Sequence, residues 1–132
     1  MRAFNPLALL VLLVTQSAPT QAADLNGAWT IDPASCNQVF TKENNKVAFT
    51  PDADLNAGGL IVQGNQITGT FQKCTVTSLH DDGTNVKVIA ACSDGVAVSD
   101  VAYDVKFSGE NNITVSSKQP VPVEMLYVRC SL

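Results

Sequence analysis

The chain has 132 residues, a formal net charge of −4, 45% hydrophobic residues and only 15% charged residues. This length predicts a single domain, and the acidic balance argues against binding to nucleic acid or to an anionic membrane surface. The four cysteines are an even number, which is typical of two disulfides in an exported protein.

The first 23 residues have the order of a secretory signal peptide. Arg2 supplies a positive charge, residues 7–14 are uncharged and apolar, and the segment ends in Ala22 and Ala23. The apolar run is shorter than the about 20 residues that a membrane-spanning helix needs. We therefore expect cleavage after Ala22 or Ala23, no membrane anchor afterwards, and a secreted or periplasmic protein. The domain then comprises residues 24–132 with a formal charge of −5, because Arg2 is the only charged residue removed.

Residues 24–132 alternate between apolar and polar positions with a period of two and show no sustained helical period. The clearest case lies within residues 101–108, where Val101, Tyr103, Val105 and Phe107 share one face. With Gly, Asn and Pro at the turns, strands are predicted near 26–31, 37–41, 46–50, 59–63, 66–79, 86–92, 98–108, 112–117 and 123–130. A helical turn that starts at Asp32-Pro33 is the alternative to the second strand.

Eight or nine short strands, joined mostly by hairpins, predict an all-β fold. Such a chain must protect the edges of its sheet, and closure into a small antiparallel up-and-down β-barrel removes those edges. A two-sheet β-sandwich is the alternative architecture. We expect the barrel, as a single disulfide-stapled domain without a helix longer than about two turns.

The pairing of the cysteines is predicted in part by a hairpin. Two β-type runs flank a segment rich in turn formers, and a hairpin centred on Gly83 places Cys74 opposite Cys92. The same register pairs two further positions on each strand, Val76 with Ala90 and Ser78 with Val88. Cys36 then pairs with Cys130 by elimination, while the two other pairings that four cysteines allow remain open.

The segment Ala23-Asp24-Leu25-Asn26-Gly27-Ala28-Trp29-Thr30-Ile31 contains a Gly-x-Trp motif. This motif resembles the opening of the first strand in lipocalin and calycin barrels. The resemblance implies a small β-barrel in which Trp29 closes one end and an arginine of the last strand, here Arg129, stacks over the indole. Such a barrel-end stack is a cation–π contact.

The nearest narrower likeness is to the small periplasmic inhibitors of serralysin-type metalloproteases, which resemble residues 23–31 and have a cysteine soon after, here Cys36. Those inhibitors insert an N-terminal arm into the protease, whereas here only one or two residues precede Leu25. Typical lipocalins carry a helix after the barrel, which this sequence does not show, and avidins need several tryptophans. The likeness therefore concerns the fold more than the activity.

Pairing the first strand with the last also requires the chain to fold back after Asp32-Pro33 if Cys36 is to reach Cys130.

No catalytic or metal-binding residue set is found in the sequence. His80 is the only histidine, and it is interpreted as a solvated turn residue. Asp100 and Asp104 share a strand face but lie about 13 Å apart on it, which is too far for a coupled acid–base pair. Residues 52–59 have the spacing of a calcium loop, but Ala57 stands where such a loop needs Gly, so a solvated turn is preferred. We expect no enzyme activity, no cofactor and no metal.

Binding is the class of function that remains. The leading hypothesis is a non-catalytic module that holds a small apolar ligand inside a calycin-like barrel. One alternative is a periplasmic protein inhibitor of an envelope or secreted hydrolase, with a filled barrel and a projecting loop or terminus; the other is a structural or stress-related envelope protein. Small barrels fill their interior with side chains, which predicts little cavity. The candidate interior residues are Val47, Phe49, Phe71, Val101, Tyr103, Val105 and Phe107.

Overall fold

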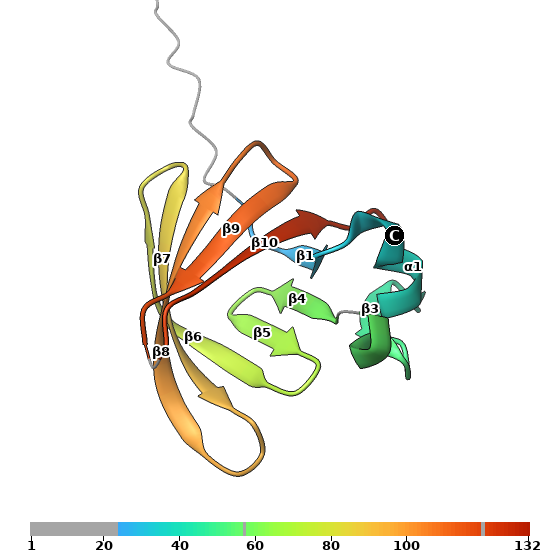
Figure 1. The fold of residues 1–132 in the computed structure, drawn as a ribbon, viewed down its shortest axis with the longest axis horizontal. Coiled ribbons are helices and arrows are strands. Elements are labelled where there is room, and N and C mark those ends of the chain that lie inside the picture. The colour runs from blue at the N-terminus through green and yellow to red at the C-terminus, as the bar shows by residue number, and fades with distance from the viewer. Residues whose placement is uncertain (1–23, 57, 120) are drawn as a thin grey trace, which may run out of the picture.

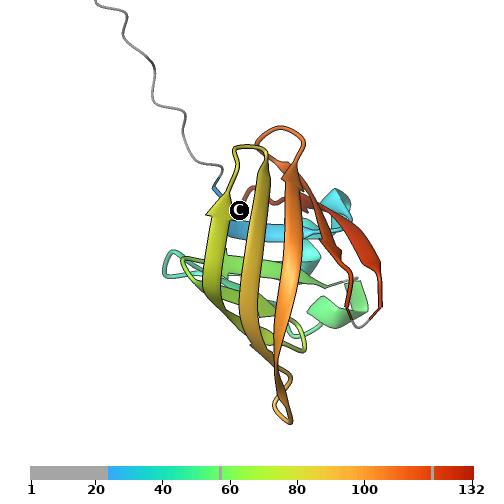
Figure 2. The same cartoon turned by 90° about the vertical axis from the view of Figure 1, so that its left-hand side faces the viewer.

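The computed structural model describes residues 24–56, 58–119 and 121–132. Its main body is a closed antiparallel barrel of eight strands in the order β1-β10-β9-β8-β7-β6-β5-β4 (Figures 1 and 2). Strands β2 and β3 form a separate two-stranded sheet. The predicted all-β barrel is confirmed, and the sandwich alternative is wrong. The predicted signal peptide lies outside the described residues.

The barrel strands follow one another in the chain, except for an excursion after the first strand. Their bounds are β1 Gly27–Thr30, β4 Gly59–Gln63, β5 Gln66–Gly69, β6 Lys73–Asp81, β7 Asn85–Ser93, β8 Val98–Phe107, β9 Asn112–Ser117 and β10 Val123–Arg129. Consecutive strands from β4 to β10 pair as hairpins, and β1 closes the ring by pairing with both β4 and β10. Closure pairs the backbone groups that an open sheet exposes at its edges.

The excursion, here called the outer segment (residues 31–58), contains the short helices. Its elements are η1 Pro33–Ser35, α1 Cys36–Val39, β2 Phe40–Glu43, β3 Lys46–Phe49 and η2 Ala53–Asn56. The Asp32 carboxylate accepts a hydrogen bond from the backbone N–H of Ala34 at 2.9 Å, and Pro33 occupies the first helical position. This cap stabilises the helical turn. The helical alternative is therefore confirmed, and the second strand starts at Phe40.

Helices are short throughout the described part of the chain, where none exceeds four residues. In those same residues, no helix has the length and apolar character needed to cross a membrane.

The outer segment packs on the outside of the barrel. Its cluster of buried residues is Ala28, Val39, Phe40, Ala53, Ile61 and Cys130. The ring of Phe40 approaches β4 so closely that a Cβ atom at Gly59 would lie 2.7 Å from its Cζ atom and 2.3 Å from the Trp29 carbonyl oxygen. Only glycine therefore fits at this position.

Both predicted disulfides, Cys74–Cys92 and Cys36–Cys130, are confirmed. The second bond joins α1 to the residue that follows β10, because the outer segment folds back directly after β1. If the chain ran straight on after β1, Cys36 would lie too far along to reach Cys130 while β1 pairs with β10. Because the chain reverses, both the disulfide and the strand pairing form.

The register of the β6–β7 hairpin differs from the prediction beyond Val76. A bulge at Thr77 shifts the pairing by one residue, so Ser78 lies opposite Ile89 and the predicted Ser78–Val88 pair is wrong. The Thr77 hydroxyl donates to the carbonyl oxygen of Ile89 at 3.2 Å. The turn is centred between residues 83 and 84 instead of on residue 83, and the bulge absorbs the extra residue. For this reason Cys74 still faces Cys92.

The predicted strand 66–79 is two strands, β5 and β6, separated by residues 70–72. The backbone N–H of Gly69 donates to the carbonyl oxygen of Gln72 at 2.7 Å, which closes a tight turn. Thr70 and Phe71 belong to residue types that favour strands, so local propensity concealed this turn.

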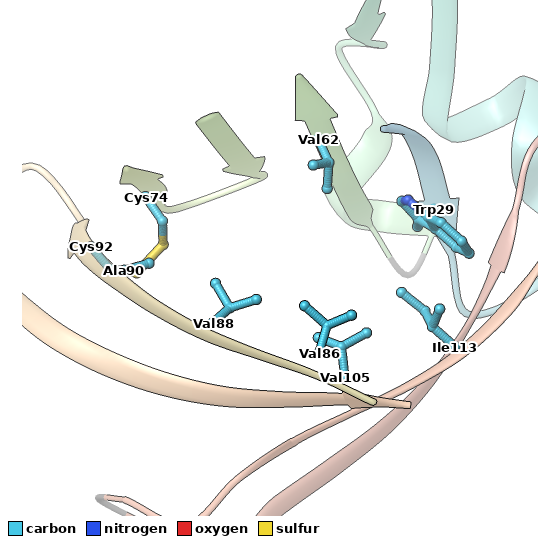
Figure 3. Packing of buried hydrophobic residues seen from close by; sticks show 9 residues of the cluster. All are labelled: Trp29, Val62, Cys74, Val86, Val88, Ala90, Cys92, Val105 and Ile113. Atoms are coloured by element: carbon cyan, nitrogen blue, oxygen red, sulfur yellow. A yellow bond between two sulfur atoms is a disulfide. The ribbon is translucent and has the colours of Figure 1, made fainter. Parts of the chain in front are cut away.

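The barrel interior holds the larger cluster of buried residues. Its members are Trp29, Val62, Cys74, Val86, Val88, Ala90, Cys92, Val105 and Ile113. Figure 3 shows these side chains. Trp29 on β1 lies near Ile113, and the Cys74–Cys92 disulfide lies at the other side of the cluster, near Ala90. Apart from the indole, the cluster is made of small and medium-sized side chains.

Candidate functional site

One end of the barrel, here called the closed end, holds an aromatic and cationic cluster. Trp29 and Arg129 are directly opposed on β1 and β10, and the guanidinium carbon lies 4.2 Å from the centroid of the indole. Phe107 of β8 meets the indole edge-on, with 6.4 Å between ring centroids. The indole Nε1–H donates to the carbonyl oxygen of Leu25 at 2.8 Å. The structure thus contains the stack that the Gly-x-Trp resemblance implies.

The guanidinium of Arg129 connects three segments at this end. Its Nη2 donates to the carbonyl oxygens of Asp24 at 2.6 Å and Glu110 at 3.1 Å, and its Nη1 donates to the carbonyl oxygen of Asn26. Gly27 has a φ angle of +136°, and a Cβ atom there would lie 3.0 Å from Nη1, so glycine permits this approach. Backbone carbonyls and an indole face therefore compensate the positive charge.

Beyond this closed end, the barrel encloses a cavity of about 490 Å³. Apolar residues form most of its wall, among them Leu60, Val62, Ile67, Val88, Val101, Val105, Ile113, Val115 and Met125. An eight-stranded barrel is wide enough either to be filled by side chains or to hold one small ligand, and in this barrel the side chains leave space. The expectation of little cavity is therefore wrong.

The other end of the cavity, here called the mouth, reaches solvent between the turns that follow β5, β7 and β9. Val121 and Val123 line the cavity there and are 62% and 49% exposed. At the other two turns, Phe71 and Val96 are 75% and 95% exposed. The β7–β8 turn projects at the end opposite the β6–β7 and β8–β9 turns (Figure 2). The mouth is therefore rimmed by exposed apolar side chains.

Two tyrosines bring hydroxyl groups into the apolar wall. Tyr103 lies on β8 and Tyr127 on β10, and both line the cavity. Burial raises the pKa of each phenol above its ordinary value, and the proximity of Tyr103 raises the pKa of Tyr127 further. The other polar side chains, closer to the mouth, are Gln72, Ser99, Ser117 and Gln119. Among the described residues, none that lines the cavity carries a formal charge.

The predicted interior residues divide between the barrel and the outer segment. Val101, Tyr103 and Val105 line the cavity, and Phe107 packs against the buried cluster beside Trp29. All four lie on β8, where the alternation in the sequence is clearest.

The other three predicted interior residues lie elsewhere, and their assignment is wrong. Val47 and Phe49 belong to β3 and pack in the outer cluster, while Phe71 lies in the β5–β6 turn and is mostly exposed. Alternation identifies residues that share a face of a strand, but it does not identify the sheet to which the strand belongs.

Sequence reasoning missed several wall residues, including Tyr127 and Met125 on β10 and Val115 on β9. A signal for the first two was present, because Val123, Met125 and Tyr127 alternate along one face that ends at Arg129. Since Arg129 stacks on the inward-facing indole, the whole face lies inside the barrel.

The polar candidates do not assemble into a catalytic site. His80 Nε2 lies 3.3 Å from a carboxylate oxygen of Asp82, and both side chains are mostly exposed. Asp100 and Asp104 are exposed on β8. Residues 53–56 form the helical turn η2. Within the ranges that the structure describes, no group of three or more His, Cys, Asp or Glu side chains is placed to hold a metal ion.

Comparisons with protein-family models, with curated proteins and with solved structures find no match to this chain. What the structure supports is the fold that the resemblance at Gly27 and Trp29 implies, a closed eight-stranded antiparallel barrel. The two disulfides indicate an oxidising, extracellular-type environment.

Proposed function

We propose that this protein is a non-catalytic, secreted or periplasmic binding module that holds a small apolar ligand inside its barrel. The observation that carries this function is the apolar cavity of about 490 Å³, which is accessible at the mouth. Ligand pockets typically measure about 300–1,000 Å³. A cavity of about 150 Å³ accepts one benzene molecule, so this one suits a considerably larger ligand.

The wall supports binding because it is formed before any ligand arrives. Hydrogen-bonded strands surround the cavity, and the Cys74–Cys92 disulfide joins two of them within the wall. A preformed site spares the ligand most of the cost of ordering the protein. Each Å² of apolar ligand surface removed from water then contributes about 25 cal/mol.

The two alternative functions make less use of this geometry. A hydrolase inhibitor is expected to have a filled barrel with a projecting segment, and the exposed apolar turns at the mouth suit a protein partner. The unfilled interior favours the small ligand over the protein partner. A structural or stress-related envelope role does not require a cavity.

A fluorescence titration with the uncharged apolar probe phenylnaphthylamine tests the proposed function. Val115 faces the cavity from β9 and pairs with Met125, so Val115→Trp fills part of the space. Leu126, on the neighbouring strand β10, is 65% exposed, so Leu126→Trp is the matched control. We expect the wild type and Leu126→Trp to bind the probe, and Val115→Trp to lose at least about tenfold in affinity.

Overpacking costs typically about 1–3 kcal/mol, so circular dichroism and thermal unfolding must show that Val115→Trp is folded. If it is not, Val101→Phe provides a milder obstruction of the same cavity. Absence of probe binding to the wild type, or equal binding by the filled variant and the control, would contradict a ligand site in the barrel.

A further inference from the structure

We infer that the cavity selects an uncharged, mostly apolar ligand with a hydrogen-bond-accepting oxygen, such as an ester, ketone or ether, to which Tyr103 and Tyr127 donate. This rests on the proposed function, because it names the ligand chemistry of the same cavity. The selectivity for a ligand oxygen depends on the tyrosines, because their hydroxyl groups belong to a wall that is otherwise mostly apolar.

The positions of the two tyrosines place them well inside the barrel. Tyr127 is opposed to Ile113 on β9 and precedes Arg129 by two residues on the inward face of β10. Tyr103 stands between Val101 and Val105 on the inward face of β8. Both rings pack against the buried cluster that includes the indole of the closed end. A ligand in the cavity therefore meets two phenols.

The hydroxyl groups have little competition from the protein. The Tyr103 oxygen lies 4.0 Å from Cys92 Sγ, a weak partner. Within the described residues, no hydrogen bond joins the Tyr127 hydroxyl to another protein group. A polar group in apolar surroundings gains free energy from an acceptor, because leaving it unpaired is costly. A ligand oxygen can supply that acceptor.

The charges around the cavity explain why the acceptor is uncharged. No described residue of the wall is cationic, and Arg129 already directs its N–H groups to the carbonyl oxygens of three residues at the closed end. A carboxylate in this cavity would lose its hydration without gaining a counter-charge, so its charged form is disfavoured. Burial also raises the pKa of both phenols, which keeps them protonated as donors.

The polar side chains at the mouth are less selective. Ser99 and Ser117 lie near the solvent-exposed residues Val121 and Val123, where water competes for the same hydrogen bonds. The net gain from a hydrogen bond falls when both partners can bind water instead. Discrimination between ligands therefore depends on the inner tyrosines.

Displacement of phenylnaphthylamine by three molecules of similar length tests this selectivity at neutral pH. The molecules are undecane, methyl decanoate and decanoate. We expect the ester to bind about tenfold more tightly than the alkane, and about tenfold more tightly than the anion. In the double variant Tyr103→Phe/Tyr127→Phe, the ester should lose about tenfold, while alkane affinity should not fall, because an alkane makes no hydrogen bond to either hydroxyl.

Two controls separate the possible failures. Ser78→Ala removes one exposed hydroxyl on β6, outside the cavity wall, and should leave the ester affinity within about twofold of the wild type, and alkane binding shows that the cavity of each variant is intact. If neither the probe nor the alkane binds the wild type, the proposed function fails. If both bind but the ester shows no advantage, or keeps it in the double variant, only the tyrosine inference is overturned. Should the double variant not fold, the single Tyr→Phe variants and the wild-type order of the three ligands decide the question.

Discussion

The closed end and the mouth are built from the same ring of strands, but their inward side chains differ in size. At the closed end, Trp29 is fully buried and Phe107 packs against its edge. Towards the mouth, the corresponding side chains are Ser99, Ser117 and Val123, and space remains between them. The diameter of a barrel depends on its strand number and shear. Side-chain volume therefore determines where that fixed interior is filled and where it is empty.

The two ends also differ in how their turns are held. Arg129 connects the residues before β1 and the β8–β9 turn to the last strand. At the mouth, the β7–β8 turn is held locally, where the Asp94 carboxylate accepts hydrogen bonds from the backbone N–H groups of Ala97 and Val96. These bonds lower the pKa of Asp94. The closed end is thus held by contacts between segments distant in the chain, whereas the β7–β8 turn is held by contacts within itself.

Replacement of Trp29 should have the largest effect of any single substitution. Because the indole is fully buried and stacks against Arg129, Trp29→Ala leaves a large cavity and an unpaired guanidinium face. We expect the free energy of unfolding to fall by about 3–5 kcal/mol. Urea denaturation followed by circular dichroism measures the loss. A change below about 1 kcal/mol would mean that the closed end does not hold the barrel together.

The two disulfides should differ because they close loops of unequal length. Cys36–Cys130 spans 94 residues, whereas Cys74–Cys92 spans 18. The chain-entropy model predicts losses of about 4–5 kcal/mol for the double variant Cys36→Ala/Cys130→Ala and about 3 kcal/mol for Cys74→Ala/Cys92→Ala. Thermal and urea unfolding of both variants check the order. A reversed order would show that the wall disulfide contributes mainly through packing.

Arg129→Lys tests the stack with the charge retained. An ammonium group does not lie flat on the indole and does not reach several carbonyl oxygens at once. We expect a loss of about 1–2 kcal/mol, measured by urea denaturation. Lys87→Arg, an exposed exchange of the same two residue types on β7, is the control and should change stability by less than about 0.5 kcal/mol. Equal effects of both exchanges would contradict a structural role for the stack.

Alkaline pH should weaken the fold through the cavity tyrosines. Their folded-state pKa values are raised above the ordinary value of 10.0, so the protonated phenols favour the folded state. This contribution is fully present below the unfolded-state pKa and is lost as pH rises through the higher folded-state values. Urea unfolding at increasing pH should show stability that declines above the ordinary value. The decline should be smaller in Tyr103→Phe/Tyr127→Phe; an identical decline would exclude these phenols as its cause.

Substitution at the mouth should have the smallest effect on stability. The Phe71 side chain is 75% exposed, so Phe71→Ser removes little buried surface and should change the free energy of unfolding by less than about 0.5 kcal/mol. Thermal unfolding of Phe71→Ser and Trp29→Ala under the same conditions compares the two ends of the barrel directly. A loss above about 2 kcal/mol would place Phe71 in a packed contact.

Local patterns predicted the features that depend on neighbours in sequence. Alternation on β8 identified Val101, Tyr103 and Val105 as inward residues, and turn formers located the β6–β7 hairpin well enough to pair Cys74 with Cys92. The same reasoning misplaced Val47 and Phe49, because their alternation is real but belongs to a sheet outside the barrel.

By itself, the sequence determined the all-β class through its period-two alternation, and it favoured the barrel over the sandwich and one pairing of the four cysteines. The residues at the closed end were implied by the resemblance at Gly27 and Trp29. Only the tertiary structure decided that the interior is hollow, that Tyr103 and Tyr127 both line it, and that a bulge at Thr77 resets one register. These features depend on the radius of the closed ring and on which side chains meet across it, and neither is a property of neighbouring residues in the chain.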